Sequence, residues 1–395
     1  MTSFTLAAAG DVLIDRPRPA TALAAVAPLL NGADLAFANF EGVLTDTQEP
    51  APGSAHATVV PTANADGLHG LDVVSLANNH SMDAGHQGLR DTLTALHQRA
   101  IRTAGAGRTL EEALTPAVFD HPGHRTTVLA LTSVFRIGVE ARRNVPGVAP
   151  LRADEYHAAR IPGVHNPGLT PRTLTVLNDQ DWHQVHTVLS AARTHTDHLV
   201  VSVHWGDHTR PWTLTDHERT CARRLIEAGA DVVLGHHQHF LRGMEFIDGK
   251  PVFYGLGHLV FDHPRFLPEM TAHGIDMEGL SPRELSARFG EFGIYPRPQT
   301  PTLPFHPLTR HTGIAVIETT SDRDTPRVAM APCYLDTEGT PRPVTPDSPH
   351  WHGCVTFLRA CQEKAALKTH VTDHGRTVNG LHVLDFAPTT EETAR

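Results

Sequence analysis

Apolar and polar positions change period along the chain, and this pattern predicts alternating strands and helices. Short, nearly continuous runs of Val, Leu and Ala are followed by segments with apolar residues at helical spacing. The apolar runs predict strands at residues 4–9, 35–38, 73–77, 126–132, 199–203 and 232–234. The helical spacing predicts helices at residues 20–30, 87–100, 181–193 and 216–228. Strands that lack polar alternation suit a sheet covered on both faces, so the pattern indicates a layered α/β fold.

The helix expected at residue 216 has clear end signals. Thr215 and Glu218 have the spacing of a capping box, and Gly229 suits the end of the helix.

The pattern breaks between residues 264 and 312, where proline is frequent and aromatic residues are scattered. We expect a long excursion over the core there, with one helix near 282–289, which serves either as a lid or as a surface embellishment. Strands are expected again at 313–318 and 327–331, followed by a helix at 351–367 and a strand at 381–386. This organisation predicts one domain over residues 1–335, containing the excursion, and a C-terminal extension over 336–395 that packs on the same domain.

Composition and charge limit the classes of partner. The formal net charge is −10, which disfavours nucleic acid, because a phosphate backbone requires a basic surface. No apolar run approaches the ~20 residues needed to span a bilayer. The first residues, MTSFTLAAAGDVLID, lack a basic segment and predict a core strand in place of a signal peptide. The four cysteines have no C-x-x-C spacing and are expected to be reduced. We therefore expect a soluble bacterial protein of the cytoplasm that acts on a small molecule, with its oligomeric state left open.

Five short polar motifs each follow a predicted strand. They are Gly10-Asp11, Asn39-Phe40-Glu41, Asn78-Asn79-His80, His204-Trp205-Gly206 and Gly235-His236-His237-Gln238-His239. Side chains at the carboxyl edge of a sheet point into one crevice, so we expect a shared pocket. Taken singly, most of these residues suit a turn or a buried core position. Together, Asp, Glu, Asn and His are the ligand set of a divalent-metal site, or an acid–base pocket without metal.

Three longer segments resemble a known family in order and spacing. They are LANNHSMDAG (residues 76–85), ADVVLGHHQH (230–239) and KPVFYGLGHLVFD (250–262). They resemble the bacterial capsule-synthesis CapA (poly-γ-glutamate biosynthesis) family, a branch of the calcineurin-like metallophosphoesterase superfamily. The resemblance implies a four-layer αββα metallophosphoesterase-like sandwich with its site at strand ends. It also implies a proton-donor role for His80. The implied metal ligands are Asp11, Glu41, Asn79, His204, His237 and His239.

The chain departs from that family's pattern at several positions. His258 stands where the family usually has asparagine, and His236 stands where a small residue is usual. We therefore expect His80, His236 and His258 to be catalytic. Asp207 and His208 follow His-Trp-Gly where the family often has glutamate. The expected substrate-binding residues are Asn78, Trp205, Asp207 and His208.

Two functions follow from these residues. The first is a CapA-like enzyme that uses divalent metal (Mn, Fe, Zn or Mg) to hydrolyse a phosphoester or related bond in a small molecule. The alternative is a metal-independent histidine acid–base enzyme of secondary metabolism, which performs dehydration, addition or cyclisation in the same pocket. A binding protein without catalysis is the third class, and the retained polar residues disfavour it.

Overall fold

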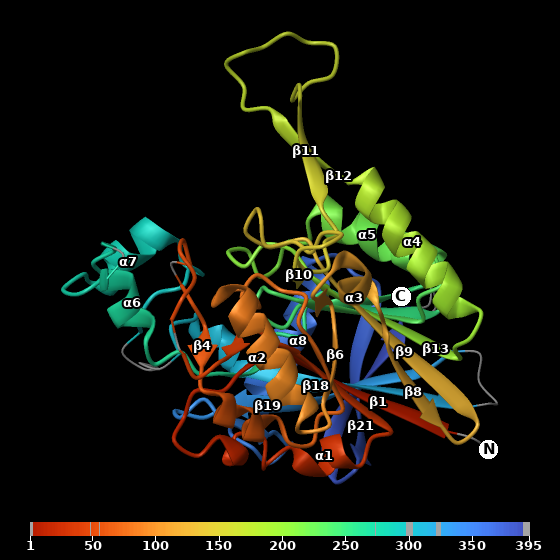
Figure 1. Ribbon diagram of the computed structural model, residues 1–395. Helices are drawn as coiled ribbons and strands as arrows, with labels where there is room; N and C mark the ends of the chain where they lie inside the picture. The colour runs from red at the N-terminus through yellow and green to blue at the C-terminus, as the bar shows by residue number, and fades with distance from the viewer. Residues whose placement is uncertain are drawn as a thin grey trace.

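The computed structural model describes residues 3–47, 49–54, 56–272, 274–297, 303–320 and 325–389 (Figure 1). Within these residues, two large β-sheets pack face to face. The first sheet runs in the order β21 (Thr369–Val378), β22 (Leu381–Pro388), β19 (Arg327–Leu335), β18 (His311–Thr320), β1 (Ser3–Leu13), β2 (Leu35–Phe40), β5 (Val73–Ser75) and β6 (Arg102–Ala104). Two short strands join it, β17 (His258–Phe261) beside β1 and β20 (Pro341–Pro343) beside β19.

The second sheet supplies the other half of the core. It runs in the order β15 (Met244–Ile247), β16 (Lys250–Phe253), β14 (Val232–His236), β13 (His198–His204), β9 (His124–Thr132) and β8 (Ala117–His121). Three strand pairs lie outside both sheets: β3 (Val43–Leu44) with β4 (Val59–Val60), β7 (Ala106–Gly107) with β10 (Gly147–Val148), and β11 (Ala153–Ala158) with β12 (Arg172–Leu177). The hairpin of β11 and β12 projects from the body of the molecule (Figure 1).

Helices cover the outer faces of the two sheets. The α-helices are α1 (Ala27–Asn31), α2 (Gly85–His97), α3 (Leu110–Leu114), α4 (Asp179–Arg193), α5 (Asp216–Glu227), α6 (Phe266–Ala272), α7 (Pro282–Phe289) and α8 (Trp351–Lys364). Short 3₁₀ segments are η1 (Pro19–Thr21), η2 (Thr62–Leu68) and η3 (Pro307–Arg310). No helix in the described part of the chain is both long enough and apolar enough to cross a bilayer.

Side-chain alternation along β1 shows how the layers are built. Leu6 and Ala8 point into the core between the two sheets, where Leu234 of the second sheet also packs. Ala7 and Ala9 point the other way, into the core beneath α1 and α2. Neighbouring residues of a strand face opposite sides, so an all-apolar strand is buried on both faces. The far face of the second sheet packs on α4 and α5, which completes the expected four-layer αββα arrangement.

The predicted strands, the capping box at Thr215 and Glu218, and the helix at 282–289 are confirmed. The helix expected over residues 20–30 is wrong, because the chain forms only η1 and the five-residue α1 there. Pro28 lacks an N–H and would clash with the preceding turn of a longer helix, so it lies in the first turn of α1. The hairpin of β11 and β12 was not anticipated.

The excursion after residue 264 forms a lobe that contains α6 and α7. The lobe has a small apolar core of its own and lies beside β4 (Figure 1). Residues 273 and 298–302 of the predicted excursion lie outside the described residues. Beyond residue 335, β21 and β22 extend the first sheet, and α8 contacts β18 and β21. The division into a domain and an extension stays a prediction.

Candidate functional site

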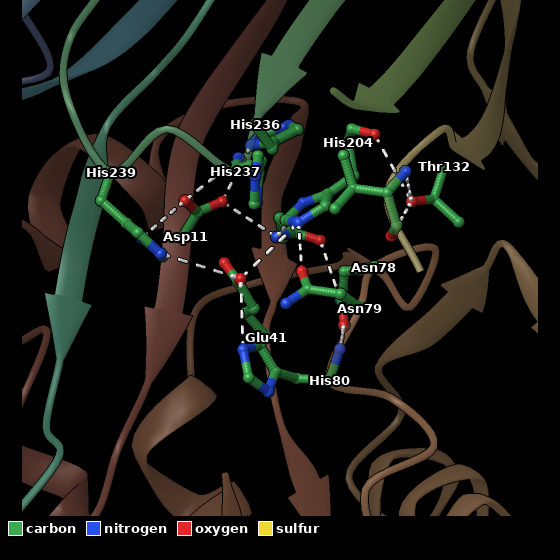
Figure 2. Close-up of polar contacts among 12 residues, drawn as sticks. Asp11, Glu41, Asn78, Asn79, His80, Thr132, His204, His236, His237 and His239 are labelled. Atoms are coloured by element: carbon green, nitrogen blue, oxygen red, sulfur yellow. Dashed lines mark hydrogen bonds and ion pairs between the residues drawn. The ribbon is translucent and has the colours of Figure 1, made fainter. Parts of the chain in front are cut away.

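Parallel strands bring the predicted motifs to one edge of the molecule. In the first sheet, Asp11 of β1 is in register with Asn39 of β2. In the second sheet, His204 of β13 is in register with His236 of β14. Figure 2 shows that the side chains of Asp11, Glu41 and His204 point toward one another across the two sheets. The expectation that the five motifs converge at strand ends is therefore met by the backbone arrangement.

Two groups of possible metal ligands share Glu41. One contains Asp11, Glu41 and His239, and the other contains Glu41, His204 and His237. Within each group the ligand atoms lie within 4.8 Å of one another. Glu41 Oε1 lies 3.6 Å from His204 Nε2 and 3.9 Å from His239 Nε2. A carboxylate common to two such groups is suited to bridging a pair of cations.

The environment of Glu41 fits a metal ligand. The residue is fully buried, and neither carboxylate oxygen accepts a hydrogen bond from any residue that the structure describes. Burial raises the pKa of Glu41 well above its usual range, and the charge on nearby Asp11 raises it further. A buried carboxylate without partners is costly unless a cation or a proton compensates it. The residues present therefore fit a divalent-metal site.

The other ligands have the ionisation that a metal requires. Burial raises the pKa of Asp11, but its contacts with His236 and His239 outweigh that effect and hold the pKa well below its usual range. Burial lowers the pKa of His204 and of His237 well below their usual range, and the neighbouring imidazoles lower both further. Asp11 is thus an anion and these two histidines are neutral, which are the forms that bind metal.

The loop after β14 is held in an unusual backbone conformation. His237 has φ of 100° and His239 has φ of 59°, values that side-chain-bearing residues rarely adopt. Gly235 precedes them, and a Cβ there would lie 2.3 Å from the carbonyl oxygen of Tyr254. Such strain persists only where the surrounding structure imposes it, and it is concentrated at functional sites. The loop therefore places two imidazoles at the edge of the sheet at a cost in backbone energy.

Three asparagines connect the strand ends. Asn39 donates to Asp11 Oδ1 at 2.9 Å and accepts from Asn78 Nδ2 at 3.1 Å. His204 Nε2 lies 2.6 Å from Asn79 Oδ1 and donates a hydrogen bond to it. Asn78 uses its remaining groups on Phe40, Ser81 and the backbone of its own loop. Asn78 therefore holds the loop in place, which corrects the prediction that it binds substrate. Asn39 was not among the predicted site residues.

Asp83, which the sequence analysis did not single out, orients His80. Its Nδ1 lies 2.7 Å from Asp83 Oδ2, and its Nε2 lies 4.0 Å from Glu41 Oε1. Asp83 also accepts a hydrogen bond from the backbone N–H of Thr58. The spacing His80-Ser-Met-Asp83 was the available signal, because residues three apart meet in a turn.

A cavity of about 410 Å³ opens onto this cluster. It is lined by four of the predicted ligand or catalytic residues and by one of the predicted substrate contacts, namely Asn79, His80, His237, His239 and His208. His56 and His263 also line it, and neither was predicted. Little in the sequence singled out these two, because the chain has 29 histidines.

Two predicted catalytic histidines lie behind the cavity wall. His236 is buried between the sheets, with Nδ1 3.4 Å from Asp11 Oδ1 and its ring beside Phe37. His258 is fully buried against His239 and Phe305. Neither side chain lines the cavity, so both expectations of direct proton transfer are corrected.

Two predicted substrate contacts also lie elsewhere. Trp205 is fully buried, stacks on Tyr254 and donates its indole N–H to the Tyr254 carbonyl oxygen. Asp207 accepts hydrogen bonds from Thr209 and Arg210, which outweigh burial and lower its pKa to about 2. Packing occupies Trp205 and neighbouring polar groups occupy Asp207, so both expectations are corrected.

The fold and the buried carboxylate–imidazole cluster define a metallophosphoesterase-like α/β protein with a candidate two-metal centre. A family model described as "Bacterial capsule synthesis protein PGA_cap" matches residues 5–263, and the chain belongs to this family.

Relatives carry names connected with capsule or polyglutamine synthesis. The PGA biosynthesis protein CapA of Bacillus subtilis is 31% identical over 60% of this chain and 56% of its own length. A probable polyglutamine synthesis accessory protein of Mycobacterium tuberculosis is 32% identical over 60% and 59%. The chain thus spans somewhat more than half the length of these relatives. A solved structure of a hypothetical protein from Thermus thermophilus covers 83% of this chain and 98% of its own, with 15% identity and a TM-score of 0.41.

Proposed function

We propose that this protein is a metal-dependent hydrolase that cleaves a phosphoester or related bond in a small molecule. One observation supports it most strongly: both oxygens of buried Glu41 lack a hydrogen-bond partner among the described residues, and two ligand groups share this carboxylate. Asp11, Glu41 and His239 would hold one cation, and Glu41, His204 and His237 the other. Divalent metals bound there supply Lewis-acid polarisation of a phosphoryl oxygen and lower the pKa of water.

His80 is the proton donor in this proposal. Asp83 accepts from Nδ1 and so directs Nε2 toward the centre, where Nε2 lies 4.0 Å from Glu41 Oε1. A carboxylate behind an imidazole stabilises its protonated form and fixes its orientation. His80 therefore gives a proton to the leaving oxygen as the bond to phosphorus breaks. Asn79 lies on the same wall, where its amide positions the reacting group.

Metal-independent acid–base catalysis is the second candidate, and the histidine-rich cavity wall favours it. Six imidazoles line the described part of the cavity, those of His56, His80, His208, His237, His239 and His263. Dehydration, addition or cyclisation requires one group to remove a proton and another to return it, and a pair of imidazoles can perform both steps.

Metal analysis and a hydrolysis assay separate the two candidates. Untagged protein, purified without added metal, is analysed for Mn, Fe, Zn and Mg and then assayed with 4-nitrophenyl phosphate. Near-stoichiometric metal and turnover that chelator abolishes support hydrolysis, and His237→Ala removes both. His183→Ala, on the exposed face of α4, is the matched control and retains both. Protein that is inert toward phosphomonoesters and diesters with all four metals contradicts the proposal and favours acid–base chemistry.

A further inference from the structure

The cavity over the candidate metal centre has two walls of opposite character. One wall is polar and carries Asn79, His80, His237 and His239. The other wall comes mainly from the α6–α7 lobe and from the chain that follows it. Its apolar side chains include Phe266, Met270, Ile275, Met277, Phe289 and Phe305, and His56 and His263 pack against Phe266. A ligand in this space therefore meets reactive groups at one end and hydrocarbon along its body.

The apolar wall is held in place by specific contacts with the core. Arg265, just before α6, donates a hydrogen bond to the Val59 carbonyl oxygen of β4 and lies 3.7 Å from Asp15. Arg297 donates to the carbonyl oxygens of Gly293, Tyr295 and other residues of its loop, with its guanidinium over the Tyr295 ring. Arg265 therefore links the lobe to β4, and Arg297 braces the lobe's own loop. The wall is thus a built surface over the centre.

Side chains of the lobe divide between its own core and the cavity. Leu280 and Leu285 pack inside the lobe and do not line the cavity. Ile275 and Phe289 belong to the same cluster, yet they also line the cavity. Phe266, Met270 and Met277 likewise serve both as buried core residues of the lobe and as lining, so the lobe presents hydrocarbon to the cavity.

The charge of the lining limits what that occupant is. Lysine and arginine are absent from the described residues that line the cavity. Burial lowers the pKa of His263 to about 3, so this lining imidazole is neutral near neutral pH. A polyanion such as a nucleotide or a polyglutamate chain requires several cationic side chains along its length. The lining therefore favours a ligand whose body is uncharged.

We propose that the substrate has an uncharged aromatic or branched aliphatic body, seated against the α6–α7 lobe, and one ester group that faces His80. This inference rests on the proposed function and names its substrate class as the phosphoester of an apolar alcohol or phenol. In hydrolysis, water forms a bond to phosphorus, the bond to the apolar alcohol breaks, and His80 gives its proton to the leaving oxygen. A cavity of about 410 Å³ accommodates a body of roughly two fused rings.

Binding of two non-hydrolysable phosphonates tests the apolar body without turnover. We expect isothermal titration calorimetry of the metal-loaded protein to show 1-naphthylmethylphosphonate binding at least about 30-fold more tightly than methylphosphonate, because the ring system leaves water. Ile275→Ala should weaken the naphthyl ligand by about 3- to 10-fold and leave methylphosphonate unchanged. Leu280→Ala removes an apolar side chain of the same lobe that does not line the cavity, and it should change neither affinity.

The outcomes separate this inference from the proposed function. Equal affinities of the two phosphonates overturn the inference, even if the protein hydrolyses phosphoesters. Equal weakening by Ile275→Ala and Leu280→Ala also overturns it, because the effect then belongs to the folding of the lobe. Retained preference for the naphthyl ligand, with no phosphoester hydrolysed under any metal, refutes the proposed function and supports the apolar body.

Discussion

Nδ1 of His80 lies 2.7 Å from Oδ2 of Asp83, three residues further along the same turn. This contact directs the other ring nitrogen toward the candidate metal centre. Asp83 is buried, whereas His80 lines the cavity. The imidazole is therefore held in one orientation before any ligand arrives.

The first prediction concerns this pair. Asp83→Asn keeps the shape of the side chain but removes its charge, and we expect kcat for an aryl phosphate to fall about 10²-fold. Metal content should stay unchanged. Asp66→Asn is the control, since Asp66 pairs with Arg99 at the surface. Unchanged kcat in Asp83→Asn would exclude His80 as the proton donor.

The second prediction concerns stability without metal. Burial and the nearby Asp11 raise the pKa of Glu41, so the metal-free folded protein retains a proton that the unfolded chain releases at its ordinary pKa near 4.5. The contribution of Glu41 to the stability of the fold is fully present below that pH, and it is lost as pH rises through the raised pKa of the folded state. In chelator, Glu41→Gln should therefore melt on the order of 2–4 °C above wild type at pH 8, with no difference near pH 4.

Calorimetry with and without Mn²⁺ checks this prediction. Added metal should raise Tm of the wild type and have little effect on Glu41→Gln, because the shared ligand is altered. A variant that is less stable than wild type at pH 8 in chelator would mean that Glu41 is compensated by protein groups alone.

The third prediction concerns acid unfolding. His217 is buried and its Nε2 lies 2.9 Å from Ser133 Oγ. Burial lowers its pKa from 6.5 to about 4, so the unfolded chain binds the proton first as pH falls. The contribution of neutral His217 to the free energy of unfolding is present above pH 6.5, and it is lost progressively as pH falls to about 4. Between pH 7 and pH 5, we expect the free energy of unfolding of His217→Gln to fall by roughly 1–2 kcal/mol less than that of the wild type.

Urea unfolding at both pH values measures this difference. His183→Gln is the control, since His183 is exposed on α4. Parallel losses in wild type and His217→Gln would contradict the prediction.

The fourth prediction concerns His258. Its ring packs against Phe305 and His239 behind the cavity wall, and burial lowers its pKa to about 3. His258→Asn and His258→Ala should both leave the shape of the pH profile of kcat/KM unchanged. His258→Ala should cost about 10-fold in rate, because His239 loses its packing neighbour, and His258→Asn should cost less. A shift of either limb of the pH profile in one of these variants would show that His258 transfers protons.

The pattern of apolar runs was sufficient to predict the strands, and the polar motifs that follow them predicted a shared pocket. The two-sheet sandwich was predicted only from the resemblance to the CapA family. A strand such as β13 is apolar on both faces, and polar residues begin where it ends, so His204 had to lie at a sheet edge. The helix expected at 20–30 failed because the periodicity was given more weight than Pro28, which restricts the helix to its first turn. The hairpin of β11 and β12 gave no clear signal, since most of its residues are exposed.

By itself, the sequence determined which chemical groups gather at the strand ends, because parallel strands carry their carboxyl ends to one edge. Only the tertiary structure decided their geometry. The packing of one sheet on the other places Glu41 between two ligand groups and removes Trp205 from the cavity. The α6–α7 lobe brings residues such as Met277 over the centre. Spacing along the chain specifies the face and edge on which a side chain lies, but distances between separate strands and loops depend on how all layers pack together.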